Sequence, residues 1–185
     1  MVSRKRSAIM ESLLKLLDER PLNKITVRDI VEDCGINRNT FYYHFEDIPA
    51  LVDAVVLEEI DRIMRQYASV SSMEECYDAA MQLFVEHRKA VYHIYNSANR
   101  EMLERSLMKI CEHVVTQFVD HAAQGMDIRP GDREIIIHSY KCECFGRVID
   151  WLNSGMKDDA EAEFLRLCEL RRGATATMLE RSKIV

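Results

Sequence analysis

The stretch that decides the fold of this 185-residue chain is TVRDIVEDCGINRNTFYYHF, residues 26–45. Thr26 stands three residues ahead of Asp29, the spacing of a capping box that opens a short helix. Gly35 suits the left-handed end of that helix, and Asn37 is a strong N-cap for the next one. Two short helices joined by a turn that contains glycine predict a helix-turn-helix.

The segment before this motif predicts an amphipathic helix over residues 7–20. Its apolar residues fall at helical spacing, and Pro21 stops the helix. After the motif, Asp47 caps another helix that keeps its apolar period to about Tyr67 and reaches roughly 30 Å. This helix is long enough to connect the motif to the rest of the chain.

The remainder of the chain also predicts helices. Only six glycines and three prolines occur, no segment alternates apolar and polar residues as a strand does, and the expected helices are 73–87, 89–96, 100–124, 131–153 and 159–180. We therefore expect an all-α fold with two domains. The first is a three-helix helix-turn-helix domain, residues 1–46, and the second is a larger helical ligand-binding and dimerisation domain, residues 47–185.

The last two expected helices each carry a stripe of apolar residues. Helix 131–153 has a heptad seam made of Ile135, His138, Cys142, Phe145, Ile149 and Leu152. Helix 159–180 carries Phe164, Leu167, Arg171, Ala174 and Met178. Both seams either face the core of one subunit or pair with a second copy in a four-helix interface, and we favour the homodimer.

Charge and composition narrow the class of protein. The net charge is −6, but residues 1–46 hold eight Lys/Arg against seven Asp/Glu, whereas residues 47–185 hold seventeen against twenty-four. A weakly basic N-terminal segment followed by an acidic remainder suits a protein that binds DNA through its N-terminal segment. No apolar run of membrane-spanning length and no signal-peptide pattern occur, so we expect a cytoplasmic protein without a membrane partner. We expect the six cysteines to be small buried apolar residues and not disulfides.

Residues 26–45 closely resemble the signature of the TetR/AcrR family. The family's motif begins with threonine, passes through a turn with glycine and ends aromatic-Tyr-x-His-Phe, as Tyr42, His44 and Phe45 do here. The resemblance implies a bacterial transcriptional regulator, most often a repressor, that binds a palindromic operator as a dimer and responds to a small molecule. We expect no cofactor.

The second helix of the motif, from Arg38 to His44 or Phe45, is the expected recognition helix. Phe41 and Phe45 lie four residues apart and should face inward, which leaves Arg38, Asn39, Thr40 and Tyr43 on the outer surface. Arginine suits guanine edges and asparagine suits adenine edges. By resemblance to the family, Tyr42 and His44 contact phosphates. Thr26 and Arg28 open the preceding helix, where they could hold a phosphate and reach a base. The alternative is that Tyr42 and Tyr43 are surface packing.

One position departs from the family's pattern. The family usually has a lysine shortly after the His-Phe pair, and here Ile48 stands in its place. Without that lysine the protein makes one phosphate contact fewer, which weakens DNA binding. We expect Arg4, Lys5 and Arg6, on a flexible N-terminus, to compensate. The alternatives are weak DNA binding or action with a partner protein, as a coactivator or adaptor that keeps the helix-turn-helix fold.

The sequence gives less information about a ligand-binding site. A mixture of apolar and polar side chains could line a small-molecule pocket, and the candidates are Met81, Phe84, Tyr92, His93, His113, His138, Cys142 and Trp151. A stripe of Met, Phe and Tyr at helical spacing is more often plain core. His138 and Cys142 are four residues apart, a workable metal-ligand pair. No second pair has firm spacing, so we expect no metal. The sequence has no phosphate loop, nucleophile elbow or His-Glu-x-x-His motif, so we expect no enzyme.

Overall fold

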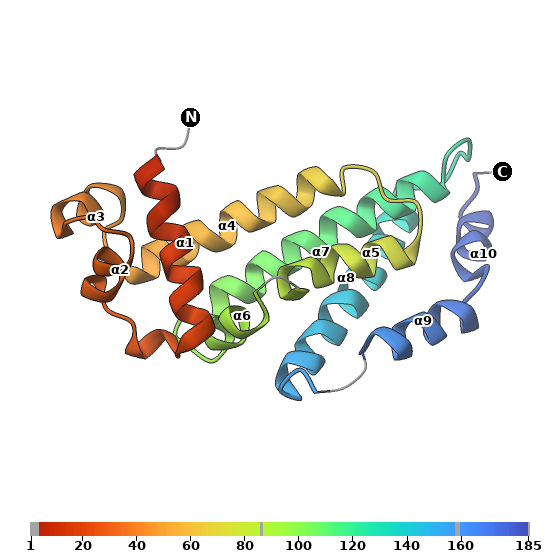
Figure 1. Cartoon of the computed structure of the whole chain (residues 1–185). Helices are drawn as coiled ribbons and strands as arrows, with labels where there is room; N and C mark the ends of the chain where they lie inside the picture. The colour runs from red at the N-terminus through yellow and green to blue at the C-terminus, as the bar shows by residue number, and fades with distance from the viewer. Residues whose placement is uncertain (1–3, 86, 158–159, 185) are drawn as a thin grey trace. The chain divides into compact units, whose positions relative to one another are not determined.

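A computed structural model describes residues 4–85, 87–157 and 160–184 of the chain, and these residues form an all-α fold (Figure 1). The elements are α1 (Arg4–Glu19), the 3₁₀ turn η1 (Leu22–Lys24), α2 (Val27–Asp33), α3 (Arg38–His44), α4 (Ile48–Gln66), α5 (Met73–Val85), α6 (Arg88–Tyr95), α7 (Arg100–Ala122), α8 (Pro130–Asn153), α9 (Ala160–Leu170) and α10 (Ala174–Arg181). The predicted fold class and the helix-turn-helix are confirmed. Among the described helices, none combines the length and the apolar character that crossing a membrane requires.

The chain divides into two compact units. The N-terminal unit comprises residues 1–61 and 83–106, and the C-terminal unit comprises residues 62–82 and 107–185. This division differs from the one we expected between residues 46 and 47, because α6 packs against α1 and therefore joins the N-terminal unit.

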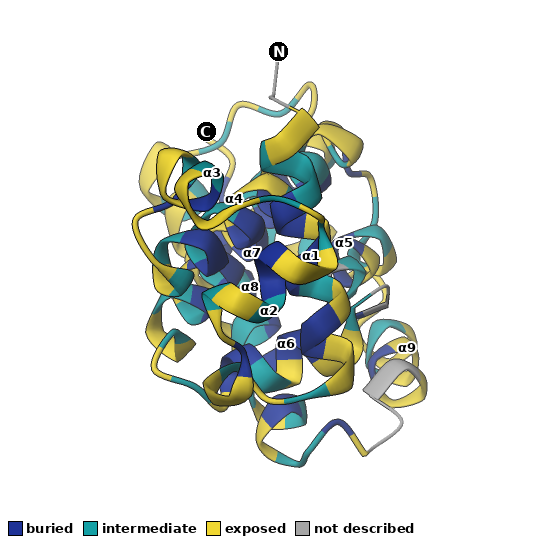
Figure 2. Cartoon of the chain, turned by 60° about the vertical axis from the view of Figure 1, so that its left-hand side comes forward, coloured by how far each residue is buried: buried dark blue, intermediate teal, exposed yellow. Residues whose placement is uncertain are grey.

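The core of the N-terminal unit lies where α1 meets α2 and α3. The apolar stripe of α1 is buried as predicted, with Ile9, Leu13 and Leu17 fully inaccessible to solvent. Ile30 from α2 and Phe41 from α3 are equally buried, and Figure 2 shows the buried sides of these helices in dark blue. Each such side chain contributes about 1.5–3 kcal/mol on burial, so the apolar contacts supply most of what fixes α3 on its scaffold.

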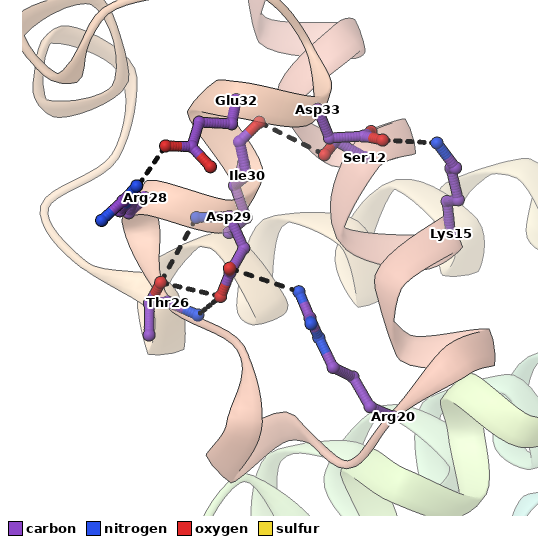
Figure 3. Close-up of polar contacts among 9 residues, drawn as sticks. All are labelled: Ser12, Lys15, Arg20, Thr26, Arg28, Asp29, Ile30, Glu32 and Asp33. Atoms are coloured by element: carbon purple, nitrogen blue, oxygen red, sulfur yellow. Dashed lines mark hydrogen bonds and ion pairs between the residues drawn. The ribbon is translucent and has the colours of Figure 1, made fainter.

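Polar contacts orient α2 on α1 (Figure 3). Lys15 pairs with Asp33, and the Arg20 guanidinium lies 3.4 Å from the Asp29 carboxylate. The buried Ser12 hydroxyl donates to the carbonyl oxygen of Ile30 at 3.4 Å. Exposed ion pairs are screened by solvent and contribute little stability, so these contacts set the angle of α2 more than they stabilise it.

The core of the C-terminal unit includes aromatic pairs between helices distant in sequence. The Tyr77 ring on α5 stacks on the Phe164 ring on α9, with centroids 4.4 Å apart. Phe118 on α7 meets Tyr140 on α8 edge to face at 6.0 Å. All six cysteines are free, as predicted, and Cys76 and Cys111 are fully buried. Burial raises the pKa of the Cys76 thiol well above its ordinary value, so this residue acts as a small apolar side chain.

Two predicted helix bounds are wrong. The single helix expected over residues 159–180 is two helices, α9 and α10, separated at Gly173; residue 159 itself lies outside the described residues. Gly173 has a φ of +83°, a left-handed conformation that glycine adopts readily and that interrupts the helix. At the other end of the chain, α1 begins at Arg4. Arg4, Lys5 and Arg6 therefore form a helical turn where we expected a flexible segment.

The two predicted seams have different environments. On α8, Ile135, His138 and Cys142 are exposed and Phe145 and Ile149 are half-buried, whereas Leu152, expected in the same seam, faces the core.

The seam predicted on the last helix has mixed surroundings: Phe164 is buried, Leu167, Ala174 and Met178 are half-buried and Arg171 is exposed. Phe164 is buried against Tyr77 of its own chain, and Arg171 pairs with Glu143 on α8. On α8, Ile135 is exposed and Phe145 and Ile149 are half-buried, so this seam leaves an apolar face available to a second molecule.

Candidate nucleic-acid interface

The turn between α2 and α3 is fixed by its own side chains. The Thr26 hydroxyl oxygen accepts from the backbone N–H of Asp29, and the backbone N–H of Thr26 donates to the Asp29 carboxylate at 2.8 Å, which confirms the capping box. Gly35 has a φ of +64°, and the N–H of Ile36 donates to the carbonyl of Val31 at 3.0 Å. This is the hydrogen bond of a glycine-terminated helix end.

The recognition helix α3 begins at its predicted cap. The Asn37 side-chain oxygen accepts from the backbone N–H of Thr40 at 2.9 Å. Phe41 is fully buried and Phe45 nearly so, as predicted, while Tyr43 between them is 84% exposed. The helix therefore holds to its scaffold by one face and presents the other to solvent.

The N-terminal end of α3 carries free polar groups. Arg38 and Asn39 are exposed, and within the described part of the chain Arg38 forms no ion pair. The Thr40 hydroxyl is partly engaged, because it donates to the Asn37 side-chain oxygen at 3.1 Å. Two bidentate hydrogen-bonding groups at the first turn of a short exposed helix suit the edges of bases in a major groove.

Thr26 and Arg28 at the start of α2 are already engaged within the chain. The Thr26 hydroxyl also donates to the Asp29 carboxylate at 2.7 Å. The Arg28 Nε lies 2.7 Å from the Glu32 carboxylate, and this hydrogen bond raises the pKa of Arg28. Both side chains of the Arg28–Glu32 pair are exposed. Such a solvated i,i+4 pair is weak and is readily exchanged for a contact with a phosphate.

The first turn of α1 lies beside α3. Lys5 lines a shallow hollow together with residues of α3 and its cap, namely Asn37, Asn39, Thr40, Tyr43 and His44. The Tyr43 and His44 rings meet edge to face at 5.0 Å. Lys5 has no ion-pair partner among the described residues. Its proximity to α3 was not predictable from spacing, because the two segments are more than thirty residues apart.

Arg6, the next basic residue, is held inside the unit. Its guanidinium lies 5.4 Å from the centroid of the Phe45 ring and 3.1 Å from the Glu58 carboxylate. Ile48, the residue in place of the family's lysine, opens α4 behind its cap Asp47, whose carboxylate accepts from the N–H of Ala50 at 2.7 Å. Ile48 lines a largely apolar hollow whose walls include Pro21, Leu22, Ile25 and Pro49.

The eight predicted ligand residues are divided among several places. Met81 and Trp151 line one small cavity. Phe84 is buried, and Tyr92 and His93 line the hollow near Ile48. The remaining three residues are placed elsewhere: the His113 ring nitrogen lies 3.3 Å from the carbonyl of Tyr67, and His138 and Cys142 are exposed on α8.

The cavity that holds Met81 and Trp151 belongs to the C-terminal unit. Its volume is about 80 Å³, and the stacked rings of Tyr77 and Phe164 form part of its wall. Arg147 at its edge lies 3.4 Å from Glu143 and 3.5 Å from Glu163, so the charged groups around it are weakly paired.

A larger hollow of about 500 Å³ shares Phe164 with this cavity and is bordered by Phe118, Tyr140 and Arg171. Residues from α5, α7, α8, α9 and α10 meet at these sites, and no local motif links them in sequence. The walls of the larger hollow combine apolar side chains with charged ones, among them Glu74, Glu143 and Arg172.

Comparison with known proteins identifies both parts of the chain. Residues 9–55 match the family model described as "Bacterial regulatory proteins, tetR family". Residues 71–173, more than half of the chain, match the model described as "Transcriptional regulator C-terminal region" of TetR proteins. The first match contains the whole helix-turn-helix, and the second contains the cavity residues.

Several curated relatives are transcriptional regulators. An uncharacterized HTH-type regulator of Bacillus subtilis, YxbF, is 23% identical over 88% of this chain and 43% of its own length. EthR of Mycobacterium tuberculosis is 39% identical over 32% of this chain and 26% of its own length. The class D tetracycline repressor of Escherichia coli is 25% identical over 68% of this chain and 57% of its own length. The chain thus spans well under two thirds of each of these relatives.

Solved structures share the fold over nearly the whole chain. GusR of Salmonella enterica has a TM-score of 0.60 at 18% identity and covers 95% of each chain. The fatty acid degradation regulator FadR of Bacillus halodurans has a TM-score of 0.55 at 14% identity, covering 97% of this chain and 96% of its own. At these identities the likeness shows the fold alone.

Proposed function

The chain belongs to the TetR family of bacterial transcriptional regulators, and from this premise we propose that it binds a palindromic operator as a homodimer and represses transcription until a small-molecule effector binds. The observation that carries the proposal is the division of α3 into a buried aromatic face and an exposed polar one. Regulators of this family bind operator DNA and typically act as dimers. Two relatives, the tetracycline repressor and KstR2, are named as repressors, which supports this direction of control.

In this proposal α3 enters the major groove by its N-terminal end. Arg38 is free to donate to a guanine and Asn39 to pair with an adenine. Each bidentate contact discriminates by about 1–3 kcal/mol against a wrong base. Thr40 and Tyr43 contact the neighbouring groove wall or a thymine methyl group.

Phosphate contacts position the helix without reading sequence. Tyr42 and His44 on α3 and Thr26 and Arg28 at the start of α2 take this role. Lys5 joins them, because it lies beside α3 and is unpaired among the residues that the structure describes. We propose that Lys5 supplies the phosphate contact that Ile48 is unable to make, while Arg6 serves the packing of the N-terminal unit.

The dimer in this proposal forms chiefly through α8. Its outward residues Ile135, Phe145 and Ile149 are apolar, and a self-complementary patch is what a two-fold symmetric interface needs. The recognition helices of the two copies then contact successive major grooves about 34–36 Å apart.

The effector in this proposal binds in the C-terminal unit, at the cavity lined by Met81, Trp151 and Phe164 and the hollow that adjoins it. α4 continues from the N-terminal unit into the C-terminal unit, so it is the element through which binding would act. Coupling equals the difference in effector affinity between the DNA-competent and incompetent conformations.

A second candidate function is an adaptor that acts through a partner protein. Ile48 favours it, because an apolar residue lines a surface hollow at a position where the family usually carries a phosphate-binding lysine. The acidic C-terminal part of the chain is also compatible with this role.

Footprinting on the DNA that flanks the protein's own gene separates the two functions. A regulator protects a near-palindrome, and this protection disappears in the Tyr42→Ala, His44→Ala double variant but remains in a Tyr92→Ala control, whose ring is exposed on α6. An adaptor leaves this DNA unprotected at low salt even when the protein is folded and dimeric.

A further inference from the structure

The exposed face of α8 carries a histidine and a cysteine, two residue types that bind metals elsewhere, near its centre. His138 and Cys142 lie one helical turn apart, and both are exposed. The His138 Nε2 and the Cys142 Sγ are 3.6 Å apart. Neither the core nor the DNA-binding role proposed above gives these two side chains a function.

Their separation matches the geometry of zinc. Zinc is bound tetrahedrally with bonds of about 2.0–2.1 Å to histidine nitrogen and about 2.3 Å to cysteine sulfur, which places two such ligands about 3.6 Å apart. The pair therefore already has the spacing of two corners of a tetrahedral site, without a change in rotamer. A thiol–imidazole hydrogen bond gives a similar distance, so a metal site also requires further ligands from outside this pair.

One copy of the chain supplies only half of a site. No group of three or more histidine, cysteine or acidic side chains suited to a metal occurs among the described residues. The outward seam of α8, however, runs from Ile135 to Ile149, and Cys142 is its midpoint. In a two-fold symmetric pair, a residue at the middle of the contact meets the same residue of the other copy.

The surroundings of the pair allow two helices to approach closely. Ser139 precedes Cys142 by one turn and Gly146 follows it by one turn, and both are exposed. A Cβ atom at Gly146 would meet nothing within 4 Å, so the protein's own packing does not require glycine there. The seam positions from Ile135 to Phe145 include no Lys, Arg, Asp or Glu that would repel its counterpart.

We propose that two copies of the chain bind one zinc ion between them, through His138 and Cys142 of each copy. The inference rests on the α8 dimer of the proposed function. The four ligands make a Cys₂His₂ set, a common composition for structural zinc. Zinc binding would then stabilise the dimer, and so the DNA-competent form, by mass action.

The test uses the full-length protein, stripped with EDTA, kept reduced, and then supplied with zinc chloride or cobalt chloride. We expect one metal ion per two chains after desalting, and a cobalt spectrum with thiolate-to-metal absorption. His138→Ala and Cys142→Ser should each weaken binding at least about tenfold. His121→Ala and Cys168→Ser are matched controls in the same unit and should bind metal like the wild type.

Sedimentation in EDTA and in zinc distinguishes failure of the metal site from failure of the proposed α8 dimer. A chain that is dimeric in EDTA but binds no zinc overturns the metal site and leaves the dimer standing. A chain that stays monomeric with and without zinc overturns the dimer and the metal site together. Dimers that form only with zinc support the site. One metal per chain, or equal binding by the variants and controls, overturns it.

Discussion

Phe41 and Tyr43 stand two positions apart on α3 and have opposite environments, one fully buried and the other 84% exposed. Lys5 and Arg6 are adjacent on α1 and differ in the same way, because Arg6 is held by Glu58 and Phe45 whereas Lys5 faces the hollow beside α3. At this scale, residues that are close in sequence and similar in chemistry differ in what they contact. Substitutions should therefore separate DNA binding from stability.

Arg38→Ala should weaken operator binding by about 1–3 kcal/mol, or about 5- to 150-fold, without changing the thermal unfolding midpoint. The reason is that Arg38 is exposed and unpaired within the described residues, so folding does not depend on it. Fluorescence anisotropy with labelled operator gives the affinity. Arg65→Ala, an exposed arginine on α4, is the control and should bind normally. Equal affinities for the two variants would remove Arg38 from the interface.

Lys5→Ala should reduce the slope of log affinity against log salt by about one, because the variant neutralises one phosphate fewer. Arg6→Ala should leave that slope unchanged and lower the unfolding midpoint, because it removes an ion pair and a contact with the Phe45 ring. Titrations at several salt concentrations and thermal melts measure the two effects. A smaller salt slope for Arg6→Ala, with an unchanged slope for Lys5→Ala, would show that Arg6, and not Lys5, contacts DNA.

At the scale of elements, the ends of α2 and α3 were predictable from sequence and the break between α9 and α10 was not. Thr26 with Asp29, and Asn37 with Thr40, are contacts between residues three apart, so their spacing identifies them. In the sequence, Gly173 is as compatible with a continuous helix packed closely against another as with a break. The residue type alone does not fix the backbone angle. The cavity was not predictable either, because its walls come from α5, α8 and α9, which are far apart in the sequence.

Gly35→Ala should destabilise the protein by about 1–2 kcal/mol, because an alanine at a φ of +64° adopts an unfavourable left-handed conformation. Open space around the position means that the cost comes from the backbone and not from a clash. Urea denaturation measures it. Gly131→Ala, in the first turn of α8 and also in open space, should change the stability by less than about 0.5 kcal/mol. Equal effects at both positions would contradict the role assigned to the turn.

The helix-turn-helix should lose stability in acid. Hydrogen bonds from Thr26 lower the pKa of Asp29, and the hydrogen bond from Lys15 lowers the pKa of Asp33. A carboxyl group whose pKa is lower in the folded state stabilises that state above its unfolded pKa, near 3.8 for aspartate, and this stabilisation is lost as the pH falls through the folded value. Asp29→Asn should destabilise the protein at pH 7. It should also weaken the dependence of stability on pH below pH 4. Unfolding midpoints between pH 2 and 7 that match those of the wild type would contradict this assignment.

At the scale of the whole molecule, the chain has little general attraction for DNA. Its net charge is −6, and four of the eight basic residues in residues 1–46 are in ion pairs with carboxylates, namely Arg6, Lys15, Arg20 and Arg28. Since the sequence-independent part of binding comes from neutralised phosphates, the proposed function requires that specific contacts by α3 supply a large share of the affinity. Two copies acting together would add the contacts of a second half-site.

Selection from a pool of random duplexes decides whether α3 reads DNA sequence as part of a dimer. We predict that the wild type enriches an inverted repeat with half-sites about one helical turn apart. Arg38→Ala should enrich the same repeat with the preference relaxed at one position in each half-site. Enrichment of no sequence by a folded dimer, or an unchanged motif for the variant, would show that α3 does not read sequence in this way.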